Sequence, residues 1–205
     1  MKSFFALIAL LAVTGIAAQT KTIYGKVTKS DGSRIKGTST MKGYEDQLII
    51  TNYTGGTDNT ATIEIEVPTN IYIATFRGMI NTAQPVTLVA KPTATSLKSA
   101  NTSSSAMPER TITQQSLQAF PISKIEISVT NRVNNSVPTL SNQIILENVR
   151  VESCTDNVAS GTSKIALKAS RIGWIYFNID ARTGKLNSIN KSGWDTVAGT
   201  AWNNF

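Results

Sequence analysis

Residues 143–151 carry the sequence QIILENVRV, the longest apolar-rich stretch of this chain with the pattern of a β-strand. Residues 122–129 (ISKIEISV) alternate between apolar and polar side chains, and so do residues 62–67 (TIEIEV). Because successive side chains of a strand point to opposite faces, this alternation predicts strands with one face in a core and the other in water. The three segments indicate a domain built mainly from β-strands.

Shorter segments rich in β-branched and aromatic residues, separated by turn residues, complete the predicted sheet. Residues 113–120 (TQQSLQAF) predict a single helix, because Thr113 can cap its start and Pro121 ends it. The expected fold class is all-β, a mainly antiparallel β-barrel or sandwich with one short α-helix. The further predicted strands are residues 22–27, 47–52, 71–76, 86–90, 163–169, 173–179 and 185–189, with 163–169 and 173–179 expected as two strands that form a pair.

The composition excludes much enzyme chemistry. The chain has no histidine and one cysteine, Cys154, so it can form neither Ser-His-Asp or Cys-His nucleophile arrangements nor an intrachain disulfide. It has no glycine-rich phosphate loop. The 20 Lys and Arg against 13 Asp and Glu give a net charge of +7, but the basic residues are spread among polar ones, so no nucleic-acid partner is expected. We predict no catalytic residue, no cofactor and no metal site.

The first residues predict an export signal. Lys2 precedes an unbroken apolar run at residues 4–13 (FFALIALLAV), and small residues follow up to Ala18. The run is too short to span a membrane, which takes roughly 20 apolar residues. We therefore expect a signal peptide at residues 1–18, a single domain at residues 19–205, no transmembrane segment and a periplasmic or secreted protein.

Residues 92–110 differ in composition, since eleven of the nineteen are Ser, Thr or Ala. Such a segment cannot bury enough apolar surface to order itself, and it predicts a loop within the domain. A linker between two domains is the alternative.

Two groups of side chains could carry chemistry. Glu64 and Glu66 share a strand face, as a carboxylate pair of a hydrolase would, but this is the polar face on which solvated glutamates normally lie. Trp174 and Tyr176 share a face with Ile172, which favours a place in the core over an exposed sugar-binding platform, and Trp194 is expected to close one end of the barrel.

Several segments, in order, resemble the Hcp family (haemolysin-coregulated protein), the tube protein of bacterial type VI secretion. The similar segments are residues 35–40 (IKGTST) with 44–50 (YEDQLII), 116–120 (SLQAF), 146–153 (LENVRVES), 163–167 (SKIAL) with 171–176 (RIGWIY), and the closing Gly193-Trp194-Asp195. The resemblance implies a compact β-barrel whose relatives form hexameric rings that stack into a tube and have no catalytic residues.

The resemblance also assigns residues. The loop over residues 34–44 would contact a neighbouring subunit, through Lys36, Gly37, Thr38, Ser39, Thr40, Lys42 and Tyr44. The residues of the family-like strand motifs would be structural, and they are Asn148, Tyr176, Gly193, Trp194 and Asp195. The tube proteins carry no signal peptide, so this chain would be an exported variant.

The leading hypothesis is a non-enzymatic structural or interaction protein that self-associates into rings or tubes and carries effectors, with secretion-system or effector proteins as partners. The alternative is an exported monomeric β-barrel that binds a glycan or surface polymer. A hydrolase that uses carboxylates alone is the third and weakest hypothesis.

Overall fold

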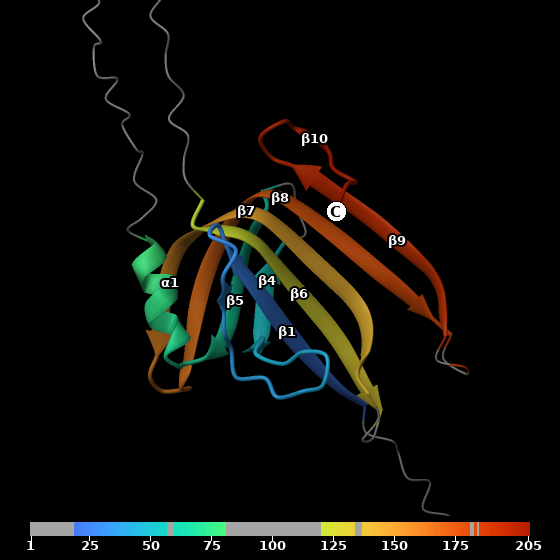
Figure 1. Cartoon of the computed structure of the whole chain (residues 1–205), viewed down its shortest axis with the longest axis horizontal. Helices are drawn as coiled ribbons and strands as arrows, with labels where there is room; N and C mark the ends of the chain where they lie inside the picture. The colour runs from blue at the N-terminus through green and yellow to red at the C-terminus, as the bar shows by residue number, and fades with distance from the viewer. Residues whose placement is uncertain (1–18, 57–59, 81–119, 134–136, 181–182, 184) are drawn as a thin grey trace, which may run out of the picture.

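The computed structural model describes residues 19–56, 60–80, 120–133, 137–180, 183 and 185–205, which form ten strands and one helix (Figure 1). All strand pairs are antiparallel, so the predicted all-β class with a mainly antiparallel sheet is confirmed. The elements are β1 (Gln19–Lys29), β2 (Arg34–Ile35), β3 (Leu48–Ile50), β4 (Asn52–Gly55), β5 (Thr62–Pro68), α1 (Tyr72–Ile80), β6 (Ile122–Val133), β7 (Thr139–Asn157), β8 (Thr162–Ile179), β9 (Leu186–Asp195) and β10 (Thr200–Ala201).

The sheet runs in the order β10-β9-β8-β7-β6-β1-β2. Strand β8 pairs with β7 along one edge, from Thr162 to Tyr176. Along its other edge β8 pairs first with β5, up to Lys168, and then with β9, from Arg171 onwards. The sheet therefore forks at β8, with β5 on one branch and β9 on the other.

The sheet does not close into the expected barrel. The segment that could close it divides between two partners, because β3 pairs with β1 whereas β4 pairs with β5. Thr51 lies between these two strands, and both its N–H and its hydroxyl donate to the Glu66 carbonyl, at 2.8 and 3.0 Å. A closed barrel would need a continuous ladder of backbone hydrogen bonds here. Only Thr51 lies between the part of the segment that pairs with β1 and the part that pairs with β5.

The prediction of two strands at 163–169 and 173–179 is wrong, because β8 is one continuous strand of 18 residues. The intervening Ser170 and Arg171 are polar but hold the extended backbone, since Ala169 and Arg171 pair in register with Val149 and Glu147 of β7. The strand continues because β7 pairs with it on both sides of this point, from Thr162 to Tyr176.

In the middle of β7 and of β8, the set of alternate residues that faces the core changes. In β7, Ile144 and Leu146 are buried in one cluster with Val149 and Val151, so the alternation shifts by one residue at Asn148. Asn148 has a φ of +52°, in the left-handed region that asparagine tolerates better than most residues. In β8, opposite this point, the buried positions shift from Leu167 and Ala169 to Ile172. This double shift forms a corner in the sheet, which we call the Asn148 corner.

The strand expected at residues 71–76 is instead the start of α1. The buried side chains Tyr72, Ile73, Phe76 and Met79 follow helical spacing, and Ala74, which a strand would place beside Tyr72, is exposed. Asn70 starts the helix, because its side-chain oxygen accepts from the N–H of Ile71 and its carbonyl from that of Ile73. Short apolar runs fit both structures, and the deciding residue, Met79, lies beyond the predicted strand.

Other strand predictions are confirmed at 22–27, 62–67, 122–129 and 143–151, while 47–52 divides into β3 and β4. The signal peptide at 1–18, the strand at 86–90, the loop at 92–110 and, apart from Phe120, the helix at 113–120 lie outside the described residues. Among the described residues, no helix has the length and apolar character to cross a membrane.

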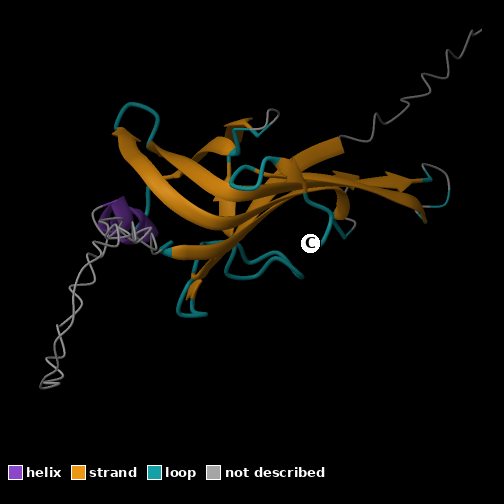
Figure 2. Ribbon diagram, turned by 90° about the horizontal axis from the view of Figure 1, so that it is seen from above, coloured by secondary structure: helices purple, strands orange, loops and turns teal. Residues whose placement is uncertain are grey.

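The sheet has a core on each face. The main cluster lies on the face that we call inner, where α1 packs against β7 at one end of the molecule, opposite the end reached by the β8–β9 hairpin (Figures 1 and 2). A small cluster of Ile145, Ile175 and Trp202, with Phe177 and Phe205 packed against it, lies on the opposite, outer face.

The Asn148 corner predicts an unusual order of substitution effects. Asn148→Val should lower the free energy of unfolding by about 1–2 kcal/mol, because a β-branched residue is strained at positive φ. Asn148→Gly should cost less than about 1 kcal/mol, since glycine adopts this φ freely. Urea denaturation of both variants measures the difference, and equal losses would show that the corner does not depend on the backbone conformation of residue 148.

Candidate functional site

The loop that the family resemblance assigned to subunit contact folds back on its own domain. The N–H of Gly37 donates to the carbonyl of Asp46 at 2.8 Å, and Ser39 and Asp46 donate to Gln47 and Ser39 at 3.1 and 2.9 Å. A Cβ on Gly37 would lie 2.2 Å from the Gln47 carbonyl oxygen, so only glycine fits. These bonds hold residues 36–47 as one compact loop, which we call the 36–47 loop.

An aromatic pair fixes the 36–47 loop to the sheet. The ring of Tyr44 stacks on Tyr24 of β1, with centroids 4.4 Å apart and an interplanar angle of 17°. Burial raises the pKa of the Tyr44 hydroxyl. Of the seven residues assigned to contact, Gly37, Ser39 and Tyr44 therefore hold the loop in place, and those that face solvent are Lys36, Thr38, Thr40 and Lys42.

The Gly193-Trp194-Asp195 motif anchors the chain after β9. The Asp195 carboxylate accepts from Arg171 Nε at 2.7 Å and from the N–H groups of Val197 and Ala198, both at 2.9 Å. The Ala198 N–H and the Arg171 guanidinium hold the pKa of this carboxyl below its ordinary value. The motif thus ends β9, and Asp195 ties the turn that follows it to β8.

Gly193 and Gly173 allow Trp202 and Phe205 to pack closely on the outer face of the sheet. A Cβ on Gly193 would lie 2.3 Å from the Trp202 carbonyl oxygen, and one on Gly173 would lie 2.7 Å from the Phe205 ring. Trp202 and Phe205 contact each other with centroids 4.6 Å apart. Trp194, on the inner face, is partly buried against the main core. The closing segment therefore packs on both faces of the sheet.

The β8–β9 hairpin carries apolar side chains on its outer face beyond this cluster. Phe177 pairs in register with Ile189, and Ile179 with Leu186. Ile189 and Leu186 are 45% and 53% exposed. We call these four side chains the outer hairpin patch. The patch continues the small outer cluster along the hairpin, beyond the part of that cluster that Trp202 and Phe205 cover.

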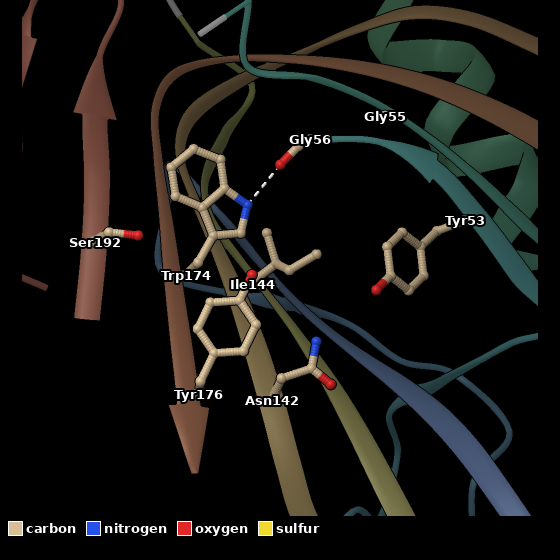
Figure 3. A pocket seen from close by; sticks show the side chains of 8 residues that line it. All are labelled: Tyr53, Gly55, Gly56, Asn142, Ile144, Trp174, Tyr176 and Ser192. Carbon is tan, nitrogen blue, oxygen red and sulfur yellow. Dashed lines mark hydrogen bonds between the residues drawn. The ribbon is translucent and has the colours of Figure 1, made fainter. Parts of the chain in front are cut away.

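The inner face of the same hairpin contains a pocket of about 360 Å³ (Figure 3). Trp174 is only partly exposed and packs against the main core, as expected, whereas Tyr176 is 52% exposed, so the expectation of a core position for Tyr176 is wrong. The ring nitrogen of Trp174 donates to the Gly56 carbonyl at 2.5 Å. The pocket is lined by Tyr53, Gly55, Gly56, Asn142, Ile144, Trp174, Tyr176 and Ser192.

Sequence reasoning selected Trp174 and Tyr176 of this pocket but missed Tyr53, Asn142 and Ser192. These three come from β4, β7 and β9, and no spacing along the chain relates them. The only local signal is the Gly55-Gly56 pair, because adjacent glycines are typical of a turn.

Glu64 and Glu66 interact with neighbouring polar side chains on the surface of the sheet. Glu64 pairs with Lys164 at 3.3 Å, and Glu66 accepts from the Thr162 hydroxyl at 2.6 Å. Burial raises the pKa of the Cys154 thiol, which lowers its nucleophilicity. Within the described ranges no group of three or more Cys, Asp and Glu side chains could hold a metal ion.

Solved structures of type VI secretion proteins share this fold. A structure described as a type six secretion system protein superposes with a TM-score of 0.58 at 11% identity, over 89% of this chain and all of that one. Hcp1 from Salmonella typhimurium matches with a TM-score of 0.56 at 9% identity, over 89% and 99% of the two chains. The secreted protein Hcp3 from Pseudomonas aeruginosa matches at 0.52 and 10%, over 85% and 99%.

These likenesses place the chain in the class of Hcp-like β-sheet proteins by fold. The resemblance first seen in short strand motifs is thus confirmed by structure. No family model matches the sequence, and no curated protein matches it. At identities of 9–11% the shared property is the fold alone.

Asp195 predicts a pH-dependent contribution to stability. Its folded-state pKa is lowered, so the carboxylate stabilises the fold above its unfolded pKa of about 4 and loses this effect as the pH falls through the folded value. Asp195→Asn should cost about 1 kcal/mol at pH 7, allowing for solvent screening, and progressively less below pH ~4.

Urea denaturation at pH 7 and at pH 3 measures this change. Glu152→Gln is the control, because Glu152 is exposed and forms no ion pair within the described residues, and its effect should be small at both pH values. An Asp195→Asn penalty of the same size at both pH values would contradict the proposed role of the charge.

Proposed function

We propose that the chain is an exported, non-enzymatic structural subunit that self-associates in rings or tubes, as the resemblance to type VI tube proteins implies. The observation that carries this proposal is the outer hairpin patch on an Hcp-like fold. Secretion-system or effector proteins would be its further partners. The apolar leader at residues 1–18 supports a periplasmic or secreted location.

The outer hairpin patch has the character of a subunit contact. Its side chains lie on a strand pair, so their backbone is fixed before association and little chain entropy is lost on binding. Ile189 and Leu186 are each about half exposed, on an outer face whose nearer part is already a core. A second copy of the chain that covers this face would extend that core.

The exposed edge of β9 lies next to the outer hairpin patch. Strand β10 pairs with β9 only at Trp194 and Asp195, so the edge of β9 from Leu186 to Ser192 has no partner strand among the described residues. Lys185 and Lys191 border this edge, and such charges disfavour uncontrolled edge-to-edge aggregation. A contact made through the apolar face of the hairpin is therefore favoured over one made by extending the sheet.

The 36–47 loop is the second proposed contact. Its hydrogen bonds and the Tyr24–Tyr44 stack hold it in one conformation, while Thr38, Thr40 and Lys42 face solvent. A preorganised loop with exposed small side chains suits docking on a neighbouring subunit, since little ordering accompanies contact. This supports the role that the resemblance gives it.

The outer hairpin patch predicts the effect of a single charge. Ile189→Lys should convert rings into monomers, because a lysine cannot be buried unpaired in an apolar contact. Light scattering and negative-stain images of the mature chain report the mass and shape of the particles. Val158→Lys is the matched control, since Val158 is 93% exposed and lies in the turn between β7 and β8. A wild-type chain that is monomeric at all concentrations would overturn the proposed self-association.

The 36–47 loop gives an independent prediction. Thr38→Arg with Thr40→Arg adds bulk and charge at two exposed positions and leaves Gly37, Ser39 and Tyr44 intact. Thermal stability should stay unchanged, while the rings or stacks of rings seen by light scattering should be lost. Deleting the loop would be less informative, because it would also remove the backbone bonds to Asp46 and Gln47. Unaltered particles in the double variant would show that the loop is not a contact.

A further inference from the structure

The pocket of Figure 3 lies in the fork of the sheet, where β5 ends its pairing with β8 and β9 begins. One wall is the end of β4 with Tyr53, Gly55 and Gly56, and the opposite side is Ser192 of β9. The floor comes from β7 and β8. The pocket is therefore built from rigid strands on three sides.

The aromatic rings of the pocket are placed to contact a ligand. Trp174 and Tyr176 lie next to each other on the inner face of β8, and Tyr53 lies across the pocket from them (Figure 3). The Trp174 orientation is fixed by its hydrogen bond to Gly56, so no ordering of this ring is needed on binding. Aromatic faces carry partial negative charge and attract weakly positive C–H groups.

Polar groups without a protein partner border the rings. The hydroxyls of Tyr53, Tyr176 and Ser192 form no hydrogen bond within the part of the chain that the structure describes. The Asn142 side-chain oxygen accepts from the Ser141 hydroxyl at 3.2 Å, and its amide nitrogen is free among the same residues. Groups that can donate or accept hydrogen bonds thus lie beside the aromatic rings.

Among the residues that the structure describes, the lining contains no Asp, Glu, Lys or Arg. A charged ligand would lose its hydration here without gaining a counter-charge, so the pocket favours a neutral one. The pocket is also open to solvent, through Tyr176 and Ser192, which gives a purely apolar ligand little burial. A sugar ring, with apolar C–H faces and hydroxyls at its rim, matches both features.

We propose that this fork pocket binds a neutral saccharide, with one or two sugar units against Trp174 and Tyr176. The volume of about 360 Å³ is near the lower end for ligand sites, which suits this size. The saccharide hydroxyls would accept from Asn142 and exchange hydrogen bonds with Tyr53 and Ser192. The site lies on the inner face of the hairpin, opposite the outer hairpin patch, so this proposal does not depend on self-association.

The test is an NMR titration of the indole N–H signal of Trp174, which the variant Trp174→Phe assigns. The probes are three neutral trimers, maltotriose, cellotriose and N,N′,N″-triacetylchitotriose, with charged trigalacturonate as the comparison. We expect a saturable shift of this signal with at least one neutral trimer, at millimolar affinity because the open pocket makes few contacts. Trigalacturonate should cause no saturable shift.

A matched pair of variants locates the site. Tyr176→Ala should weaken binding about fivefold to tenfold, because the exposed ring contacts the sugar but contributes little to the core. Val158→Ala, at an exposed position in the turn between β7 and β8, outside both the pocket and the outer hairpin patch, should leave the affinity unchanged.

Three results would overturn the proposal. They are no saturable shift with any neutral trimer, equal binding of trigalacturonate, and an affinity that Tyr176→Ala leaves unchanged. A Trp174 signal that changes with protein concentration and not with saccharide would show that a second copy of the chain fills the pocket, and would also overturn it.

Discussion

The structure depends on strand β8, which changes its partner along one edge from β5 to β9. Along its other edge it stays paired with β7 past this change. Along one edge β8 pairs with β7 from Thr162 to Tyr176, and along the other it leaves β5 at Lys168 and takes up β9 at Arg171. The corner at Asn148 and Ser170 lies at this exchange, so the inner core continues from Leu167 to Ile172 although the alternation shifts. Because β9 and β5 diverge here, the sheet forks.

The segment after β9 stabilises this junction. The Ser170 carbonyl accepts from both the N–H and the hydroxyl of Thr196, at 2.9 and 2.8 Å, and Arg171 binds Asp195 from the neighbouring position. Strand β7 opposite is fixed by its own pairing with β6. The family-like motif that ends in Asp195 thus has a structural role, because it stabilises the junction at which β5 and β9 diverge.

The fork gives the β8–β9 hairpin two faces of different chemistry. On the outer face, Phe177 and Ile189 continue an apolar core and suit contact with another subunit. On the inner face, Trp174 and Tyr176 border a polar pocket that suits a small neutral ligand. Assembly and ligand binding can therefore coexist on one hairpin, because alternate residues of a strand point to opposite sides.

The sequence by itself determined the strands whose alternation is regular, such as residues 62–67 and 122–129, because burial of one sheet face imposes a period of two. It also marked Gly193, Trp194 and Asp195 through their resemblance to a known motif. It predicted a strand at 71–76 where the structure has the start of α1, since this short apolar run fits either structure until Met79 is packed. Only the tertiary structure decided that β8 is one strand, that the sheet stays open, and that Tyr53, Asn142 and Ser192 meet at Trp174. Those outcomes depend on which strands lie side by side. Pairing between residues about a hundred positions apart, as in β5 and β8, leaves no periodic signal along the chain.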